Sequence, residues 1–166
     1  MNTKDLIDFI SKKMKEKPGF FMFRDSEPQV NLNDINEIEN RLVARFPNSY
    51  IEVLRNFGGG TFAFGEIFSI SPDSDFYVLN EYEKYKFIPS FFYPISSDGV
   101  GGYYGFIKDK DVFKDEIYYL DYDLNDIQVE KTKWNFIRFF GMHSILRKID
   151  VAVPCDSKFL DALRVF

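Results

Sequence analysis

The sequence predicts an α+β domain with a largely antiparallel sheet. Helical periodicity fills the first third of the chain, whereas the apolar alternation typical of strands follows the glycine run Gly58-Gly59-Gly60. Because the helices are grouped ahead of the strands, an α+β class is favoured over alternating α/β units. The 166 residues, of which 45% are hydrophobic and 28% charged, suffice for one domain with its own core.

Three helices are expected before the glycine run. In the first, from Thr3 to Glu16, apolar residues recur every four positions, and Pro18-Gly19 ends it. The second starts near Asn33-Asp34, which suit a helix N-terminus, and ends before Phe46-Pro47. The third begins at Pro47, since proline suits the first helical position, and the glycines stop it.

The remainder of the chain is expected to form strands, interrupted by one helix and followed by another. A turn over Ser71–Ser74 precedes a helix over Asp75–Lys84, and a final helix over Lys133–Leu146 directs Trp134, Ile137 and Phe140 inward. A tail from Asp150 to Phe166 holds a short helix candidate around Phe159. Expected strands are Thr61–Phe64, Glu66–Ile70, Phe87–Ile95, Tyr103–Ile107, Glu116–Tyr122 and Ile127–Glu130, with a turn over Lys108–Lys114.

The charge balance limits the classes of partner. A net charge of −5 disfavours nucleic acid and anionic membrane surfaces, because both are negatively charged. It suits a basic partner, or does no more than maintain solubility. The chain has one cysteine, Cys155, and no apolar run that resembles a signal peptide or a membrane span. We therefore expect a cytoplasmic protein without an internal disulfide.

Aromatic residues are unusually abundant, with 20 Phe, 10 Tyr and 1 Trp making up 19% of the chain. Most are expected in strands and in the core, where large apolar side chains contribute most. The number is high for one small core, so some are expected at the surface, where aromatic side chains serve as protein-binding anchors. This surplus also leaves a homodimer open.

The residues predict no catalytic, cofactor or metal site. His143 is the single histidine and has no nucleophile motif beside it, so a structural or surface role is favoured. Cys155 has acidic neighbours, unlike a catalytic thiolate. Neither Gly58-Gly59-Gly60 nor Gly99-Val100-Gly101-Gly102 carries the Lys-Ser/Thr ending of a phosphate loop. The segment from Asp121 to Thr132 lacks the glycine and glutamate of a calcium loop.

Acidic and aromatic side chains interleave after the glycine run, in the segments Glu66–Asp75 and Asp98–Asp123. Such a run is most simply a solvated face, but the aromatics give it the means to anchor a basic partner and the charges to steer it. We therefore take these segments as the candidate docking surface. The candidate partner-binding residues are Glu66, Asp73, Asp75, Asp98, Tyr103, Tyr119, Asp121 and Asp123.

Several motifs follow one another in a recognisable order. They are the helix Ile35–Leu42, Phe46-Pro47-Asn48-Ser49-Tyr50, Asn56-Phe57-Gly58-Gly59-Gly60, the Pro-Ile and Asp-Gly-Val-Gly of Tyr93–Phe106, the strand Ile117–Asp121 and the helix Trp134–Phe140. In order and spacing they resemble the SUKH superfamily, which includes the fungal cell-wall-assembly regulator and many bacterial immunity proteins. The sequence departs from the pattern where Phe46 replaces a leucine and Phe57 separates Asn56 from the glycines.

The resemblance covers about residues 33–140 and leaves out the N-terminal helix and the C-terminal helical tail. We expect the whole chain, residues 1–166, to form one domain. It implies helices packed on a twisted, mainly antiparallel sheet. For bacterial members it implies an immunity protein that binds a cognate toxin, often a nuclease. The family has no established enzymatic residues to carry over; Pro47, Tyr50, Gly59 and Gly60 match its motif and are expected to serve caps and packing.

Three hypotheses about function remain at this stage. The first is an immunity protein that occludes a basic protein toxin. The second is a regulatory or scaffold module that binds a different protein. The third is an enzyme or small-ligand binder, which would need a cavity with converging polar groups.

Overall fold

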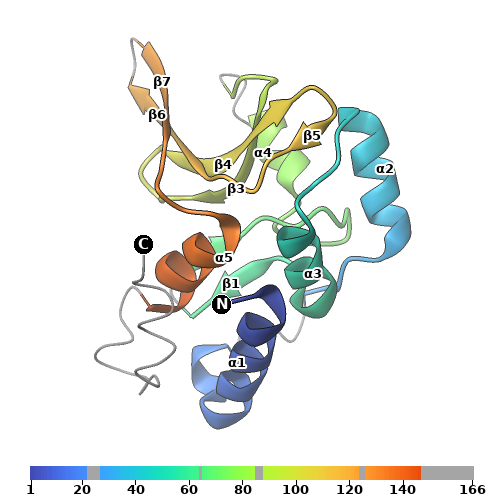
Figure 1. Cartoon of the computed structure of the whole chain (residues 1–166), viewed down its shortest axis with the longest axis vertical. Helices are drawn as coiled ribbons and strands as arrows, with labels where there is room; N and C mark the ends of the chain where they lie inside the picture. Colours follow the sequence, from blue (N-terminus) through green and yellow to red (C-terminus); the bar gives the residue numbers. More distant parts are fainter. Residues whose placement is uncertain (22–26, 64, 85–87, 124–125, 147–166) are drawn as a thin grey trace.

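The structure, a computed structural model, describes residues 1–21, 27–63, 65–84, 88–123 and 126–146. It is α+β, as the sequence predicts (Figure 1). Its main sheet is antiparallel, with strand order β3-β4-β6-β7 and β5 paired to β4. The strands are β3 (Phe92–Ser97), β4 (Tyr103–Asp109), β5 (Val112–Phe113), β6 (Tyr118–Asp123) and β7 (Asp126–Lys131); β1 (Gly60–Phe62) and β2 (Gly65–Ile67) form a separate hairpin.

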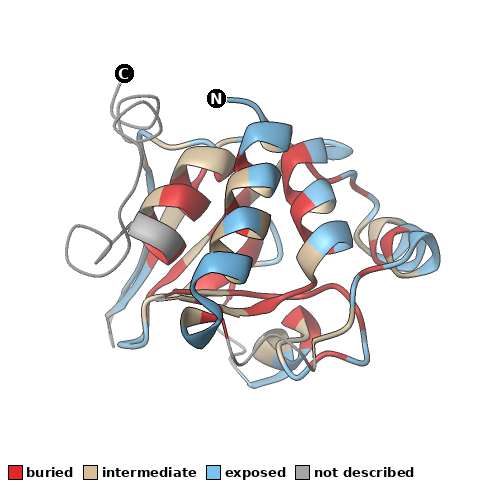
Figure 2. Ribbon diagram, turned by 90° about the horizontal axis from the view of Figure 1, so that it is seen from below, coloured by how far each residue is buried: buried red, intermediate tan, exposed pale blue. Residues whose placement is uncertain are grey.

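Helices cover the two faces of the main sheet unequally. Figure 2 shows α3 (Asn48–Phe57) and the C-terminal helical segment standing over one face, with their buried sides towards the sheet, and α1 (Thr3–Glu16) packs against α3. The short helix α4 (Val78–Lys84) lies against the opposite face. Since side chains alternate along a strand, Tyr104 and Phe106 of β4 face α3 and the C-terminal helix, whereas Tyr103 faces α4.

The first helix has the predicted bounds, and the next two are shifted slightly. The side chain of Asn2 caps α1 by accepting from Asp5 N at 2.9 Å. The second helix, α2, spans Leu32–Leu42, because Asn31 and not Asn33-Asp34 caps it. Pro47 is the N-cap of α3 and not its first residue, and Gly58 ends that helix at φ 72°, as predicted from the glycines.

Several other predicted boundaries are wrong. Strand β2 ends at Ile67 and not at Ile70, and β3 spans Phe92–Ser97 in place of Phe87–Ile95. Helix α4 begins at Val78 and not at Asp75, since Tyr77 is held in a bridge to Ser69. The expected turn over Lys108–Lys114 contains the end of β4 and the strand β5. The final helix starts at Phe136 and not at Lys133, because Asn135 caps it.

This final helix also differs from the prediction in geometry. The α-helical part, α5, spans Phe136–Phe139 and continues as the π-helix η3 over Phe140–Leu146. Phe140 is buried as expected, whereas Trp134 and Ile137 are half-buried. Phe136 and Phe139 instead form its fully buried side.

The core between the sheet and the helices is made largely of aromatic rings. Tyr50 of α3 is fully buried, and its ring contacts Phe106 and Phe136 edge-on at centroid distances of 5.5 and 5.3 Å. Its hydroxyl donates to Phe68 O at 2.9 Å, which gives the one polar atom of this residue a partner. Most aromatic residues that the structure describes are buried or half-buried, and Phe91 and Tyr122 are exposed, so the core accounts for more of them than the sequence suggested.

The part of the chain beyond Leu146 lies outside the described residues. It contains Cys155 and the helix candidate around Phe159. The extent of the domain over 1–166 therefore stays a prediction.

Candidate protein-binding surface

A hollow of about 540 Å³ opens beside α4, on the face of the sheet that carries Tyr103. Residues from both predicted docking segments line it: Glu66 and Asp75 from the first, and Tyr103 with the loop Gly99–Gly102 from the second. The strand β2, the turn after it and the β3–β4 loop thus form walls of one concave surface. Its remaining lining residues are Phe68, Phe76, Glu81, Lys84, Ser97 and Tyr122.

The chemistry of the hollow is acidic and aromatic. Its described lining includes three carboxylates, Glu66, Asp75 and Glu81, against one cation, Lys84. Tyr103 is buried at 3% exposure, and its hydroxyl donates to Glu81 Oε2 at 3.0 Å. This bond ties β4 to α4 and fixes one carboxylate at the wall. Asp75 is exposed and Glu66 half-buried, so both can meet a cation from solvent.

The loop at the rim is organised by Asp98. Its Oδ1 accepts from Val100 N at 2.8 Å and from Gly102 N at 2.9 Å, and its Oδ2 accepts from the Tyr119 hydroxyl at 2.7 Å. Partial burial raises the pKa of Asp98, but the hydrogen bonds from Tyr119 and the loop N–H groups outweigh it and hold the pKa below the ordinary value. Burial and the bond to Asp98 likewise raise the pKa of Tyr119. Asp98 and Tyr119 therefore shape the loop.

The remaining candidate residues do not line the hollow. Asp73 is exposed in the turn before α4, and Asp121 is exposed on β6. Asp123 ends β6, and its side chain lies outside the described part of the structure. Whether any of the eight candidates contacts a partner stays a prediction.

Sequence reasoning did not single out several residues of this surface, Glu81 and Val100 among them. Glu81 lies in a helix that is apolar on its other side, and its meeting with Tyr103 depends on tertiary packing. Val100, at the tip of the rim loop, is 89% exposed. The sequence held a usable signal in Gly99-Val100-Gly101, because a valine between two glycines at a loop tip has no core to join.

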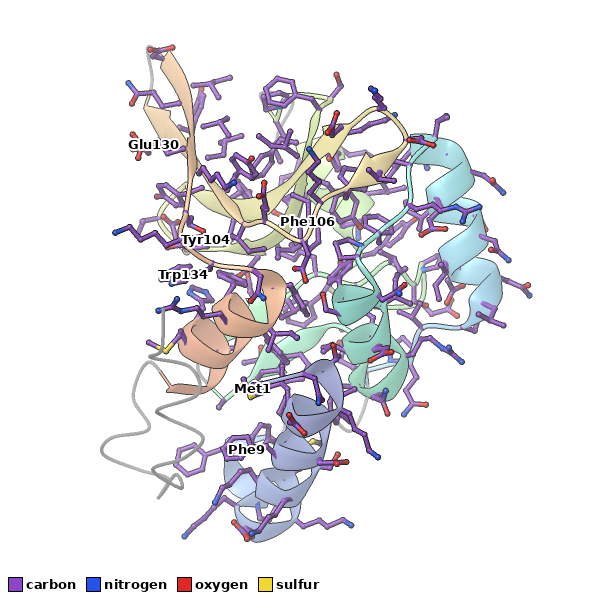
Figure 3. All side chains as sticks on the ribbon, in the orientation of Figure 1. Met1, Phe9, Tyr104, Phe106, Glu130 and Trp134 are labelled. Atoms are coloured by element: carbon purple, nitrogen blue, oxygen red, sulfur yellow. The ribbon has the colours of Figure 1, made fainter. Side chains whose placement is uncertain are left out.

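His143 is the residue for which a structural or surface role was predicted, and the structure buries it. Its ring stacks on that of Phe139 at a centroid distance of 4.9 Å. It also lies 5.0 Å from the ring of Tyr104, a residue of β4 (Figure 3). Its Nε2 is 3.4 Å from Ser96 Oγ, and Ser96 is fully buried. Closed off from solvent in this way, the pair packs β3 against η3.

A second hollow, of about 620 Å³, lies between α2 and the turn before β5. Its rim includes Leu32 and Val43, which are 61% and 69% exposed, and Val43 has φ 50°, a strained value for a β-branched residue. None of the eight candidate partner-binding residues lines this hollow, although Asp111 of the second docking segment does.

The described residues also bear on metal binding and on membrane insertion. Among these residues, no group of three or more His, Cys, Asp or Glu side chains is placed to hold a metal ion. Every helix in the same ranges is too short or too polar to span a bilayer.

The protein is an α+β domain. Helix α3 and the C-terminal helical segment pack on one face of its antiparallel sheet, and the opposite face carries α4 and the acidic, aromatic hollow. A family model, SUKH_6, described as SMI1-KNR4 cell-wall, matches residues 32–140. The match spans well over half of the chain, so the protein belongs to this family of the SUKH superfamily. No curated protein matches the chain.

Proposed function

We propose that this protein is an immunity protein, which binds a cognate bacterial toxin, often a nuclease, and neutralises it by occlusion. Membership of the SUKH superfamily supports a protein-binding role of this kind. The observation that carries the proposal is the hollow beside α4, where Glu66, Asp75 and Glu81 surround aromatic side chains. A concave acidic surface with aromatic anchors suits a basic protein.

Charge and apolar contact have separate tasks in this proposal. The carboxylates around the hollow attract a basic surface and speed the encounter, an effect that salt screens over about 10 Å at 0.1 M. Tyr122, which is 37% exposed at the wall, and Val100 at the rim supply apolar area that is buried on binding. We therefore expect association to slow at high salt, while dissociation depends mainly on the apolar contacts.

We assign no reaction to the hollow. The buried hydroxyl of Tyr103 donates to Glu81 and holds β4 against α4, which is a structural task. The proposal is therefore one of binding without catalysis.

The test is protection of cells that express the toxin encoded beside this protein's gene. Co-expression of the protein is expected to restore growth, and the purified pair is expected to form a complex. Failure to protect against any neighbouring toxin would count heavily against an immunity role.

A matched pair of variants tests the surface. Glu66→Gln with Asp75→Asn removes two charges at the hollow, whereas Asp8→Asn with Glu52→Gln removes two exposed charges on α1 and α3, across the sheet. The first pair is expected to slow association on the order of tenfold at low salt, and the second to change it little. Equal effects of the two pairs would mean that binding uses another surface.

A regulatory or scaffold module with a non-toxin partner is the alternative, favoured by the cell-wall description of the matching family. A gene neighbourhood without a toxin, together with capture of a partner that has no toxic activity, would distinguish it from the immunity role.

A further inference from the structure

The outer edge of the main sheet is a second surface, separate from the hollow. Strand β7 ends the strand order, and its six residues pair with β6 in continuous register from Tyr118–Lys131 to Asp123–Asp126. At the opposite end of the sheet, β3 is covered, since Phe68 N donates to Ile95 O at 2.8 Å. Figure 1 shows the β6–β7 hairpin projecting beyond the helices.

The backbone groups that face outward from β7 follow from one hydrogen bond. Thr132 N donates to Ile117 O at 2.9 Å, so the position of Thr132 in this ladder faces β6. Inward-facing and outward-facing positions alternate in an antiparallel pair, which leaves Ile127, Val129 and Lys131 with outward N–H and C=O groups. Among the described residues, no backbone hydrogen bond reaches these three positions from outside β6. They form a regular row that another strand can pair with.

One face of the hairpin is acidic. Gln128 and Glu130 of β7 lie opposite Asp121 and Tyr119 of β6, and Asp126 follows on the same side. Asp121, Asp126 and Glu130 are exposed, and Figure 3 shows Glu130 on the projecting hairpin. The one lysine of β7, Lys131, is held by Glu116 at 2.6 Å. No ion pair within the described ranges involves Asp121, Asp126 or Glu130, so this part of the edge presents negative charge.

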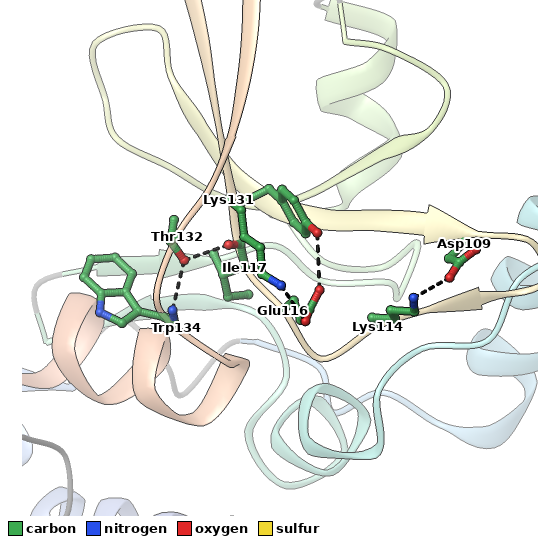
Figure 4. A network of polar contacts seen from close by, with 8 residues as sticks. Asp109, Lys114, Glu116, Ile117, Lys131, Thr132 and Trp134 are labelled. Carbon is green, nitrogen blue, oxygen red and sulfur yellow. Dashed lines mark hydrogen bonds and ion pairs between the residues drawn. The ribbon is translucent and has the colours of Figure 1, made fainter. Parts of the chain in front are cut away.

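The base of the hairpin is fixed by a polar network (Figure 4). The Glu116 carboxylate accepts two hydrogen bonds, through Oε2 from the Tyr118 hydroxyl at 3.2 Å and through Oε1 from Lys131 Nζ at 2.6 Å. Thr132 Oγ1 donates to Ile117 O at 2.7 Å and accepts from Trp134 N at 3.2 Å. A strand held in this way needs little ordering when a second strand pairs with it.

We propose that β7 binds an extended segment of a partner protein, which adds a strand to the sheet and carries Lys or Arg at every second position. Main-chain hydrogen bonds to Ile127, Val129 and Lys131 supply the pairing, and basic side chains on the acidic face meet Asp126 and Glu130. A second copy of this chain fits less well, because it brings the same acidic residues together across the new pair. The proposal deepens the proposed function by naming how a basic partner is held, and it rests on that function for the partner's charge.

The probe is an acetylated and amidated peptide, Lys-Thr-Lys-Val-Lys-Thr-Lys, added to the full chain labelled with ¹⁵N. We expect the amides of Ile127, Val129 and Lys131 to exchange rapidly without peptide and to become protected with it. Amides of Gln128 and Glu130 are expected to be protected in both states, because they already face β6.

A matched pair of variants isolates the main-chain contact. Val129→Pro removes an outward N–H, a change that an edge strand tolerates, and Val129→Ala keeps that N–H. Val129→Pro is expected to weaken peptide binding on the order of tenfold or more, and Val129→Ala to change it less than about threefold. The same peptide N-methylated at alternate residues tests the contact from the other side with the protein unchanged, so a folding defect in Val129→Pro cannot obscure the answer.

Three results would overturn the inference: protection of the three amides without peptide, equal binding of the N-methylated peptide, or spectral changes confined to the hollow residues. Protection of the three amides that grows with protein concentration alone would also overturn it, in favour of a second copy. If the Val129→Pro variant protects cells from the toxin as well as the parent does, the edge contact is refuted and the immunity role is unaffected. Loss of protection with Val129→Pro but not with Val129→Ala would support both.

Discussion

Strands β3 and β7 are the two end strands of one sheet, and their surroundings are opposite. Five consecutive residues of β3, from Phe92 to Ser96, are buried, whereas five of the six residues of β7 are exposed. Helix α4, the chain after β2 and the helices over the sheet enclose β3. Strand β7 pairs with β6 on one side, no strand of the described residues pairs with its other side, and its side chains on one face are acidic and exposed.

The comparison shows that an end position in the sheet does not decide whether a strand is buried; the side chains of the strand and the elements packed against it do. The sequence Phe-Tyr-Pro-Ile-Ser-Ser supplies aromatic area for a core, and the bulge between Pro94 and Ser96 lets a proline sit within the strand. The sequence Asp-Ile-Gln-Val-Glu-Lys of β7 instead leaves five of its six side chains exposed. We therefore expect changes in β3 to act on stability and changes in β7 to act on recognition.

The largest expected effect is that of Phe92→Ala in β3. Phe92 is fully buried, so its truncation leaves a cavity and is expected to lower the free energy of unfolding by about 3–5 kcal/mol. Ile127→Ala in β7, where the side chain is 39% exposed, is expected to cost less than about 1 kcal/mol. Urea unfolding of both variants measures the contrast, and equal losses would remove it.

Gly105→Ala tests how closely β3 and β4 approach. A Cβ at Gly105 would lie 2.3 Å from Tyr93 O and 2.6 Å from Phe92 Cζ, so the two strands must separate. We expect a loss of about 1–3 kcal/mol in unfolding free energy. The control is Gly19→Ala, where a Cβ meets nothing within 4 Å, and its midpoint in urea should stay close to that of the parent. A mild Gly105→Ala would show that β3 adjusts more freely than its burial implies.

Tyr119→Phe removes the hydroxyl that donates to Asp98 and is expected to cost about 1 kcal/mol at neutral pH. Because the folded state lowers the pKa of Asp98 from its ordinary 3.8, this carboxylate contributes stability above about pH 4, and the contribution is lost as pH falls through the lowered pKa. In Tyr119→Phe the pKa of Asp98 is lowered less, so the variant should lose less unfolding free energy between pH 5 and about pH 2 than the parent does. Unfolding at a series of pH values measures it; identical acid profiles would contradict the assigned role of the bond.

Lys131→Met is expected to have the smallest effect. The Lys131–Glu116 pair is short at 2.6 Å, but the two side chains are 55% and 39% exposed, and such pairs contribute about 0–1 kcal/mol. A double-mutant cycle with Glu116→Gln gives the coupling free energy directly. A coupling well above 1 kcal/mol would show that the hairpin base is more strongly held than an exposed pair allows.

Local sequence patterns predicted much of the fold. The helix Thr3–Glu16 has its predicted bounds, because its period and Pro18 act over a few residues. The strand β5 was hidden in a charged segment, because its stability comes from distant partners: Phe113 stacks on Phe46 at 5.0 Å, and Phe113 N donates to Arg45 O at 2.8 Å. The π-helical turn after Phe139 likewise has no local signal.

The candidate surface divides in the same way. The acidic and aromatic composition of the two docking segments was evident from the sequence, as were the α+β class and the family motifs. The hydrogen bonds from Tyr119 to Asp98 and from Tyr103 to Glu81 could not be predicted, because each joins residues more than twenty positions apart.

The sequence alone determined the charge, the side-chain periodicity and the order of helices and strands, since these depend on residues near one another in the chain. The tertiary structure decided which carboxylates face solvent beside the hollow and which edge of the sheet pairs with no further strand among the described residues. The physical reason is that strand pairing and burial depend on contacts between distant segments, and side-chain alternation states which residues share a face but not what covers it.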